Sequence, residues 1–126
     1  MEIKKESLEN GQIIKLDVGT ELNNNQLSGT VELDIENQAQ FVGVINDILD
    51  KSSSKLIINM KNISYIDSSG LWAIFEGHKK AVQQNSNLVL ISPTKDVKRV
   101  LDITKMSSKV QIFDTEALAI KNLLSD

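Results

Sequence analysis

The stretch "LIINMKNISYIDSSGLWAIF", residues 56–75, decides how this chain folds. It opens with an almost wholly apolar run at 56–60, which is typical of a β-strand covered on both faces. It closes with apolar residues at helical spacing, and the polar junction "DSSG" at 67–70 lies between the two. This order of strand, junction and helix predicts a βα unit whose junction lies at the carboxyl end of a parallel strand.

The alternation of helix and strand continues on both sides of this stretch. Short apolar runs at 88–91 and 110–113 predict two more buried strands. Apolar residues at helical spacing predict four helices; Pro93 suits the start of the third, and Asp114 or Thr115 can cap the last. In chain order, the apolar stripes of these helices are Phe41, Val44, Ile45, Ile48 and Leu49; Leu71, Ile74, Phe75, His78 and Val82; Val97, Val100 and Leu101; and Ala117, Leu118, Ile120, Leu123 and Leu124.

The amino-terminal part of the chain reads as strands. Residues 12–18 and 27–35 alternate between apolar and polar, which is the pattern of half-buried strands. The segment between them, "GTELNNNQ" at 19–26, is rich in residues that favour turns, so we predict that the two strands form a hairpin. Residues 2–7 can add an edge strand before an Asn-Gly turn.

Together these elements predict one α/β domain over residues 1–126, a mixed sheet with an N-terminal hairpin, parallel central strands and about four helices. The absence of cysteine excludes disulfides and thiolate metal sites. No apolar run could span a bilayer and no signal peptide is recognisable, so we expect a cytoplasmic protein with no membrane partner. The net charge of -3 gives no reason to expect direct binding to nucleic acid.

The junction allows two interpretations. Asp67 and Ser68 are both residue types that cap helices, so the segment can be an ordinary N-cap. A helix N-terminus also has unpaired N–H groups and a partial positive charge, so it accepts a phosphate with little rearrangement. In the second interpretation the hydroxyl is there to be modified.

The sequence lacks the sets of residues that the common kinds of active site need. A serine nucleophile needs a base within hydrogen-bond reach, and the single histidine, His78, follows Ser68 by ten residues on the same predicted helix, roughly 15 Å along its axis. Neither a metal-ligand set nor a glycine-rich phosphate loop is recognisable. We therefore expect no catalytic activity, no cofactor and no metal. A serine hydrolase remains as a third hypothesis, and it would lose activity in both Ser68→Ala and His78→Ala.

Three stretches resemble one protein family. Residues 56–75 are similar to the core of STAS domains, specifically those of bacterial anti-sigma factor antagonists, in which an apolar strand, an Asp-Ser-Ser-Gly type junction and an apolar helix follow each other. "LVLISPTKDVKRVLDITKMSSKVQIFDTEALAI" at 88–120 resembles the family's later strands and helices. "VELDIENQAQF" at 31–41 is similar to its "E-L-D-x-x-N" segment. The resemblance covers roughly residues 27–124.

The resemblance implies a STAS fold and a switch. The serine after the aspartate is the family's usual phosphorylation target, which here is Ser68, with Ser69 as the alternative hydroxyl. Asp67 and Gly70 complete the junction, and Asp34 lies at a strand end that the family uses near its partner. The unphosphorylated form would bind an anti-sigma factor that is itself a GHKL-type serine kinase, and so free the sigma factor. Phosphorylation would break the complex, and a PP2C-type phosphatase would reset a protein that we expect to be a monomer.

Some alternatives stay open at this stage. Trp72, one position off the apolar stripe, can be a partner anchor or can shield a neighbouring loop. The first fifty residues are acidic and the remainder is basic, which can reflect a docking face or two differently solvated surfaces. The alternative function is a structural STAS subunit of a stress-signalling assembly or of a lipid-transport complex. A group of basic residues reads as a solvated helix face: Lys95, Lys98, Arg99 and Lys105.

Overall fold

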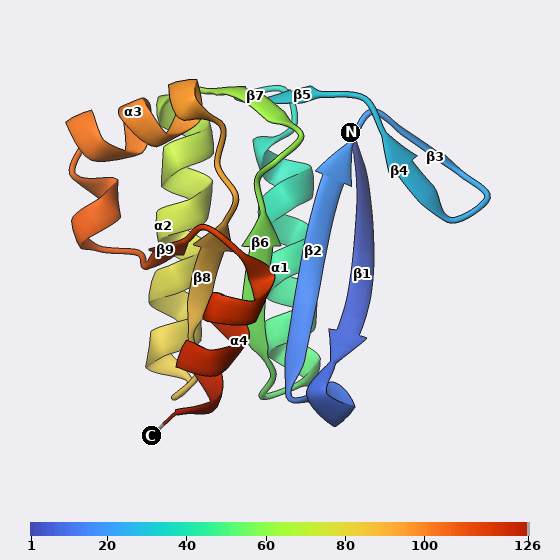
Figure 1. Cartoon of the computed structure of the whole chain (residues 1–126), viewed down its shortest axis with the longest axis vertical. Coiled ribbons are helices and arrows are strands. Elements are labelled where there is room, and N and C mark those ends of the chain that lie inside the picture. Colours follow the sequence, from blue (N-terminus) through green and yellow to red (C-terminus); the bar gives the residue numbers. More distant parts are fainter. Residues whose placement is uncertain (126) are drawn as a thin grey trace.

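The computed structural model describes residues 1–125, and its centre is a five-stranded mixed sheet with helices on both faces (Figure 1). The N-terminal strand, at one edge of the sheet, is antiparallel to its neighbour, and the other pairings in this sheet are parallel, as the sequence predicts. In spatial order the strands are β1 (Glu2–Leu8), β2 (Ile13–Gly19), β6 (Lys55–Asn59), β8 (Leu88–Ile91) and β9 (Ile112–Phe113).

Within residues 1–125, four α-helices and two short 3₁₀ turns complete the main body. Helices α1 and α2 pack together behind the sheet in Figure 1, α4 lies in front of it, and α3 lies at the upper left. The helices are α1 (Gln38–Lys51), α2 (Ser68–Gln83), α3 (Lys95–Ile103) and α4 (Glu116–Leu124), and the turns are η1 (Glu9–Gly11) and η2 (Met106–Ser108).

Two small ladders lie outside the main sheet. The hairpin of β3 (Glu21–Asn23) and β4 (Gln26–Ser28) projects from the end of β2, and β5 (Val31–Leu33) pairs in parallel with β7 (Ile63–Ile66). The second ladder runs across the carboxyl edge of the main sheet, above the first turns of α1 and α2 (Figure 1).

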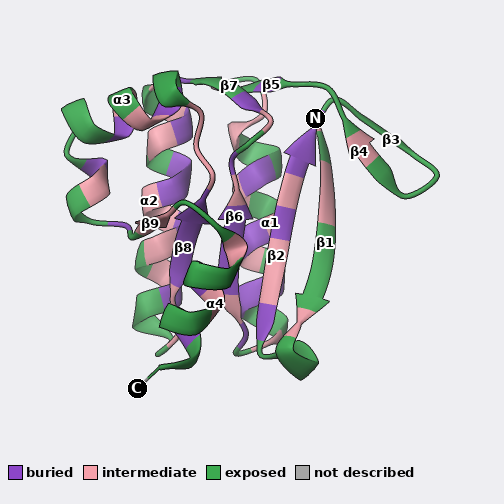
Figure 2. Cartoon of the chain, in the orientation of Figure 1, coloured by how far each residue is buried: buried purple, intermediate pink, exposed green. Residues whose placement is uncertain are grey.

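The core has two parts because the central strands are covered on both faces (Figure 2). In β6, Leu56 and Ile58 face the large cluster shared with α1 and α2, whereas Ile57 faces a smaller cluster. Ala119 and Leu123 of α4 close that smaller cluster. The prediction of a strand buried on both faces is thus confirmed. Among the described residues, no helix has the length and apolar character needed to cross a membrane.

The predicted strand over 27–35 is wrong as a single element. Gly29 has a φ of +77°, which breaks the extended chain between β4 and β5. Ile35, expected on the apolar face, is 68% exposed in the turn that follows β5. The alternating pattern at 27–35 thus spans two short strands, β4 and β5, which belong to different ladders.

The amino-terminal hairpin exists, but with a different partner. Strand β2 pairs along its whole length with β1, through the Asn-Gly turn of η1, and not with residues 27–35. Asn10 and Gly11 both have positive φ in this turn, which explains why this residue pair occurs there. The turn-rich segment 19–26 instead lies mostly within the separate β3–β4 hairpin.

Three smaller predictions also need correction. The order of strand, junction and helix leaves residues 61–66 as a loop, but 63–66 form β7. Val82 is 51% exposed, because it lies one position away from the face of α2 that packs against the core. The last strand is shorter than predicted, since only Ile112 and Phe113 are paired. The buried residues of α2 are Gly70, Ala73, Ile74, Gly77 and Ala81.

Candidate functional site

The β5–β7 ladder brings two acidic residues to one edge of the molecule. Leu33 and Ile66 are register partners at the ends of these parallel strands, so the residues that follow them, Asp34 and Asp67, leave neighbouring strands at the same level. The N–H of Asp67 donates to the carbonyl of Leu33 at 3.3 Å, which ties the junction to β5. The sequence indicated each aspartate separately, but it did not predict that the two strands pair.

Asp67 is the N-cap of α2. Its Oδ1 accepts hydrogen bonds from the N–H groups of Ser69 at 2.9 Å and Gly70 at 3.1 Å. The capping interpretation is therefore confirmed for Asp67. Ser68 is the first residue of the helix and is exposed, so the cap leaves its hydroxyl accessible at the positive end of α2. Ser69 is only partly exposed.

Gly70 is the residue that lets α2 approach β5. A Cβ atom at this position would overlap the carbonyl oxygen of Leu33 and would lie 2.7 Å from Cγ1 of Ile66. No real side chain fits at these distances without moving the backbone. The glycine of the junction thus has a packing role, and it fixes how the first turn of α2 sits on the β5–β7 ladder.

Asp34 begins a hydrogen-bonded turn between β5 and α1. Its Oδ1 accepts from the N–H of Glu36 at 3.0 Å, and its own N–H donates to Oδ1 of Asn37 at 3.0 Å. The Nδ2 of Asn37 donates to the carbonyl of Glu32 at 2.7 Å. Sequence reasoning did not single out Asn37, although an amide side chain directly before a helix is a recognisable turn signal. The partly exposed Asp34 carboxylate is held in place beside the junction by this network.

Trp72 lies on the outer surface of α2, one turn after Ser68. Residues four apart on a helix are neighbours on one face, so its ring and the Ser68 hydroxyl share a surface. The Trp72 side chain is 49% exposed and lines an open groove of about 460 Å³ together with Val42 and Asn46 of α1. Ile35 is exposed on the turn between β5 and α1. Apolar side chains are thus available near the two aspartates.

His78 does not belong to this site. It is partly buried further along α2, and its Nδ1 lies 3.1 Å from the carbonyl oxygen of Leu88. Its place on the same helix, ten residues after Ser68, leaves roughly 15 Å along the axis between the two residues. No cluster of three potential metal-ligating side chains occurs within residues 1–125.

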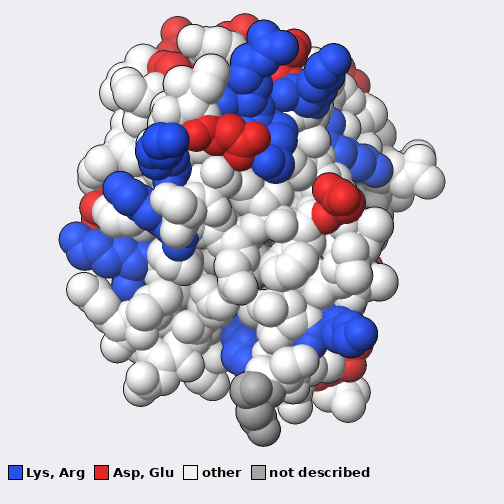
Figure 3. Space-filling view, turned by 60° about the vertical axis from the view of Figure 1, so that its left-hand side comes forward, with Lys and Arg blue, Asp and Glu red and all other residues white. Residues whose placement is uncertain are grey.

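Basic side chains gather on the face that carries α3, in the upper and left part of Figure 3. Of the residues singled out in the sequence, Lys95, Arg99 and Lys105 are exposed. Lys98 pairs with Asp102 one turn later, at 2.8 Å between Nζ and Oδ1. The hydrogen bond from Lys98, and after it a weaker contribution from a hydrogen bond with Ser107, lower the pKa of the Asp102 carboxyl.

Comparison with known proteins identifies the family. The model of the STAS domain family matches residues 26–119, which is most of the chain. The chain belongs to the STAS domain family. The matched STAS region includes the β5–β7 ladder, the capped junction and all four helices up to the middle of α4.

Relatives within the STAS family share one described role. A protein of Thermotoga neapolitana, provisionally named an anti-sigma factor antagonist (TM1081 homolog), is 32% identical over 93 residues, which cover 73% of this chain and 82% of that protein. The anti-sigma-B factor antagonist of Staphylococcus epidermidis is 29% identical over 82 residues, covering 64% of this chain and 75% of that one.

Solved structures of SpoIIAA have the same fold over nearly the whole chain. The anti-sigma factor antagonist SpoIIAA in its unphosphorylated form superposes with a TM-score of 0.73 at 17% identity, covering 96% of this chain and 95% of that one. The Bacillus SpoIIAA in its phosphorylated form gives 0.66 at 16% identity, covering 96% and 98%. At this identity the likeness concerns the fold alone.

Proposed function

We propose that this protein is an anti-sigma factor antagonist and that phosphorylation of Ser68 switches its binding off. The single observation that carries the proposal is the exposed Ser68 hydroxyl at the start of α2, beside a carboxylate that already caps the helix. The names of the relatives support the antagonist role, and SpoIIAA, which shares the fold, has an unphosphorylated and a phosphorylated form.

The partner we propose is an anti-sigma factor of the GHKL serine-kinase type. When Ser68 is unphosphorylated, the anti-sigma factor would contact the edge formed by Asp34, the junction and Trp72, and would release its sigma factor. The kinase would transfer phosphate to Ser68, with Ser69 as the alternative, and a PP2C-type phosphatase would remove it. We infer a cytoplasmic protein that acts as a single STAS domain and a monomer, without catalytic activity of its own.

The electrostatics of the junction make such a switch effective. A phosphoryl group adds about −1.5 to −2 charges at neutral pH. Within the free protein, the N-terminal dipole of α2 offsets part of this charge. In a desolvated interface the phosphate would face the nearby carboxylates of Asp67 and Asp34 without water, and about 1.4 kcal/mol of added repulsion already lowers affinity tenfold.

The test is a pair of pull-downs from native lysate with Ser68→Ala and Ser68→Asp as baits. We expect the Ala form to retain a GHKL-type kinase and the Asp form to lose it. Ser69→Asp is the matched control, because it places the same charge one residue further along α2. Circular dichroism of every bait checks the fold.

Three results would contradict the proposal. If both Ser68 baits hold the same partners, Ser68 is not the switch, and a structural STAS subunit becomes the better description. If neither bait retains a kinase, the antagonist role fails. If Ser69→Asp alone loses the kinase, the modified hydroxyl is that of Ser69.

A further inference from the structure

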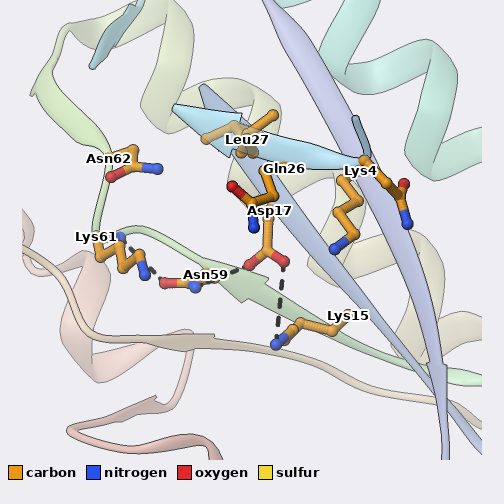
Figure 4. Close-up of a pocket in the computed structure, with 10 residues that line it drawn as sticks. Lys4, Lys15, Asp17, Gln26, Leu27, Asn59, Lys61 and Asn62 are labelled. Carbon is orange, nitrogen blue, oxygen red and sulfur yellow. Dashed lines mark hydrogen bonds and ion pairs between the residues drawn. The ribbon is translucent and has the colours of Figure 1, made fainter. Parts of the chain in front are cut away.

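A polar cavity lies on the face of the sheet opposite α1 and α2, at the carboxyl ends of β2 and β6 (Figure 4). Its volume is about 300 Å³. The β3–β4 hairpin forms one wall through Gln26, and the loop after β6 forms another through Lys61 and Asn62. Neither the Ser68 switch nor the core uses these side chains.

The floor of the cavity is an ordered carboxylate. Asp17 Oδ1 accepts from Nδ2 of Asn59 at 2.8 Å, and Oδ2 lies 3.9 Å from Nζ of Lys15, beyond hydrogen-bond distance. Lys15 directs its hydrogen bonds to Glu6 at 3.0 Å and Glu116 at 2.6 Å. Asp17 Oδ2 is therefore able to accept a hydrogen bond from a group that enters the cavity.

Two ammonium groups border the same space without a carboxylate partner. Lys4 and Lys61 line the cavity from different sides of Asp17 in Figure 4, and within residues 1–125 neither has a carboxylate oxygen within 4.0 Å of its Nζ. The amide side chains of Gln26 and Asn62 add N–H donors to the walls. The cavity thus presents cations and amide groups at its rim and a carboxylate oxygen that can accept a hydrogen bond at its floor.

We propose that this cavity binds a small organic anion that carries both a phosphate or carboxylate group and a hydroxyl group. The anionic group would lie between Lys4 and Lys61, and the hydroxyl would donate to Asp17 Oδ2. Inorganic phosphate lacks the separate hydroxyl arm that would donate to Asp17 Oδ2 while the anionic group contacts the two lysines, so it should bind more weakly. The volume lies at the lower end of ligand sites, roughly 300–1,000 Å³, which suits a compound of the size of glycerol 3-phosphate.

The test is a titration followed in ¹H–¹⁵N NMR spectra of the full chain. The probes are glycerol 3-phosphate, glycerate, inorganic phosphate and glycerol, so that phosphate and carboxylate sources are distinguished and each half of the ligand is tested alone. We expect glycerol 3-phosphate or glycerate to shift the backbone amide signals of Gln26, Lys61 and Asn62, with an affinity about tenfold above that of phosphate or glycerol.

Variants tie the binding to the cavity. Lys4→Met and Lys61→Met should each weaken it by about tenfold, because each removes a charge-assisted hydrogen bond. Lys79→Met, which removes an exposed lysine on α2, is the control and should change nothing. The spectra themselves report whether each variant is folded.

Three results would overturn the proposal. If inorganic phosphate binds as well as the organic anions, the site holds an adventitious ion only. If the Lys4 and Lys61 variants bind as well as the parent, the binding lies outside this cavity. If no signal moves with any organic anion up to about 10 mM, the cavity is not a ligand site. No anti-sigma factor is needed, so the outcome is independent of the proposed switch.

Discussion

At the scale of single residues, the junction divides its tasks. Asp67 caps α2, Gly70 permits close packing and Ser68 is left exposed. Only the third task leaves a side chain free to meet a partner. Of the four residues predicted as one binding motif, Asp67 and Gly70 therefore build the site and Ser68 presents an exposed hydroxyl, while Ser69 is only partly exposed.

Gly70→Ala should destabilise the protein by about 1–3 kcal/mol, because the new methyl group would overlap the carbonyl oxygen of Leu33. Alanine is otherwise the better helix former by about 0.5–1 kcal/mol, so the clash must outweigh this gain. Gly43→Ala in α1 is the matched control, since a Cβ there meets nothing within 4 Å and the variant should be more stable. Urea unfolding measures both, and equal effects at the two sites would refute the packing role.

Asp67→Ala should lower the free energy of unfolding by about 1 kcal/mol, because α2 loses the acceptor for two N–H groups. Asp67→Asn keeps a side-chain oxygen and should stay close to the parent. Chemical denaturation of the two variants separates the cap from the charge. An Asn variant as unstable as the Ala variant would mean that the negative charge, rather than the hydrogen bonds, stabilises α2.

At the scale of elements, the sequence predicted what depends on local pattern. The helices and the buried strands β6 and β8 could be predicted because the spacing of their apolar residues is visible within a short stretch of sequence. The pairing of β5 with β7, which assembles the site, depends on contacts between residues about 30 apart, and alternation alone carries no information about partners. For the same reason the two aspartates and the serine could be named from the sequence, while their mutual arrangement could not.

Lys15 links helix α4 to the sheet, because its ammonium group forms ion pairs with Glu116 of α4 and with Glu6 of β1. Partial burial disfavours the charged form, but hydrogen bonds to Glu116 and Glu6 and the charge of Asp17 outweigh it and raise the pKa of Lys15 above its ordinary value of 10.5. A raised lysine pKa stabilises the fold fully below the unfolded value, and this stabilisation declines as the pH rises from there towards the folded value.

Lys15→Met should therefore be less stable than the parent by about 1.5–3 kcal/mol at neutral pH, the range for hydrogen bonds to charged groups. The difference should stay constant up to about pH 10 and shrink above it. Unfolding curves at neutral and alkaline pH test this, with Lys79→Met as the exposed control. A difference that grows with pH would contradict the assigned direction of the pKa shift.

At the scale of the whole molecule, the two proposed sites avoid the core. The two buried clusters lie between the sheet and its helices, whereas the Ser68 edge and the polar cavity are built on the short ladders and loops at the carboxyl ends of the strands. In open α/β sheets this is the edge where ligands gather, because loops can vary there while the strands stay fixed. A change of charge at Ser68 should then alter recognition and leave folding intact.

Ser68→Asp tests this separation directly. The residue is exposed at the first position of α2, where a negative charge contributes about 0.3–1 kcal/mol through the helix dipole, so the variant should be as stable as the parent or slightly more so. Thermal and urea unfolding by circular dichroism measure the stability of the variant.

The fluorescence of Trp72 measures binding of the isolated partner. Trp72 is the single tryptophan and is 49% exposed, so its signal reports whether the partner covers the edge formed by Asp34, the junction and Trp72. Parent-like stability with no Trp72 response to the partner is the expected pair of results. If Ser68→Asp instead unfolds more easily by about 2 kcal/mol or more, lost binding would follow from lost structure and the switch would have no basis.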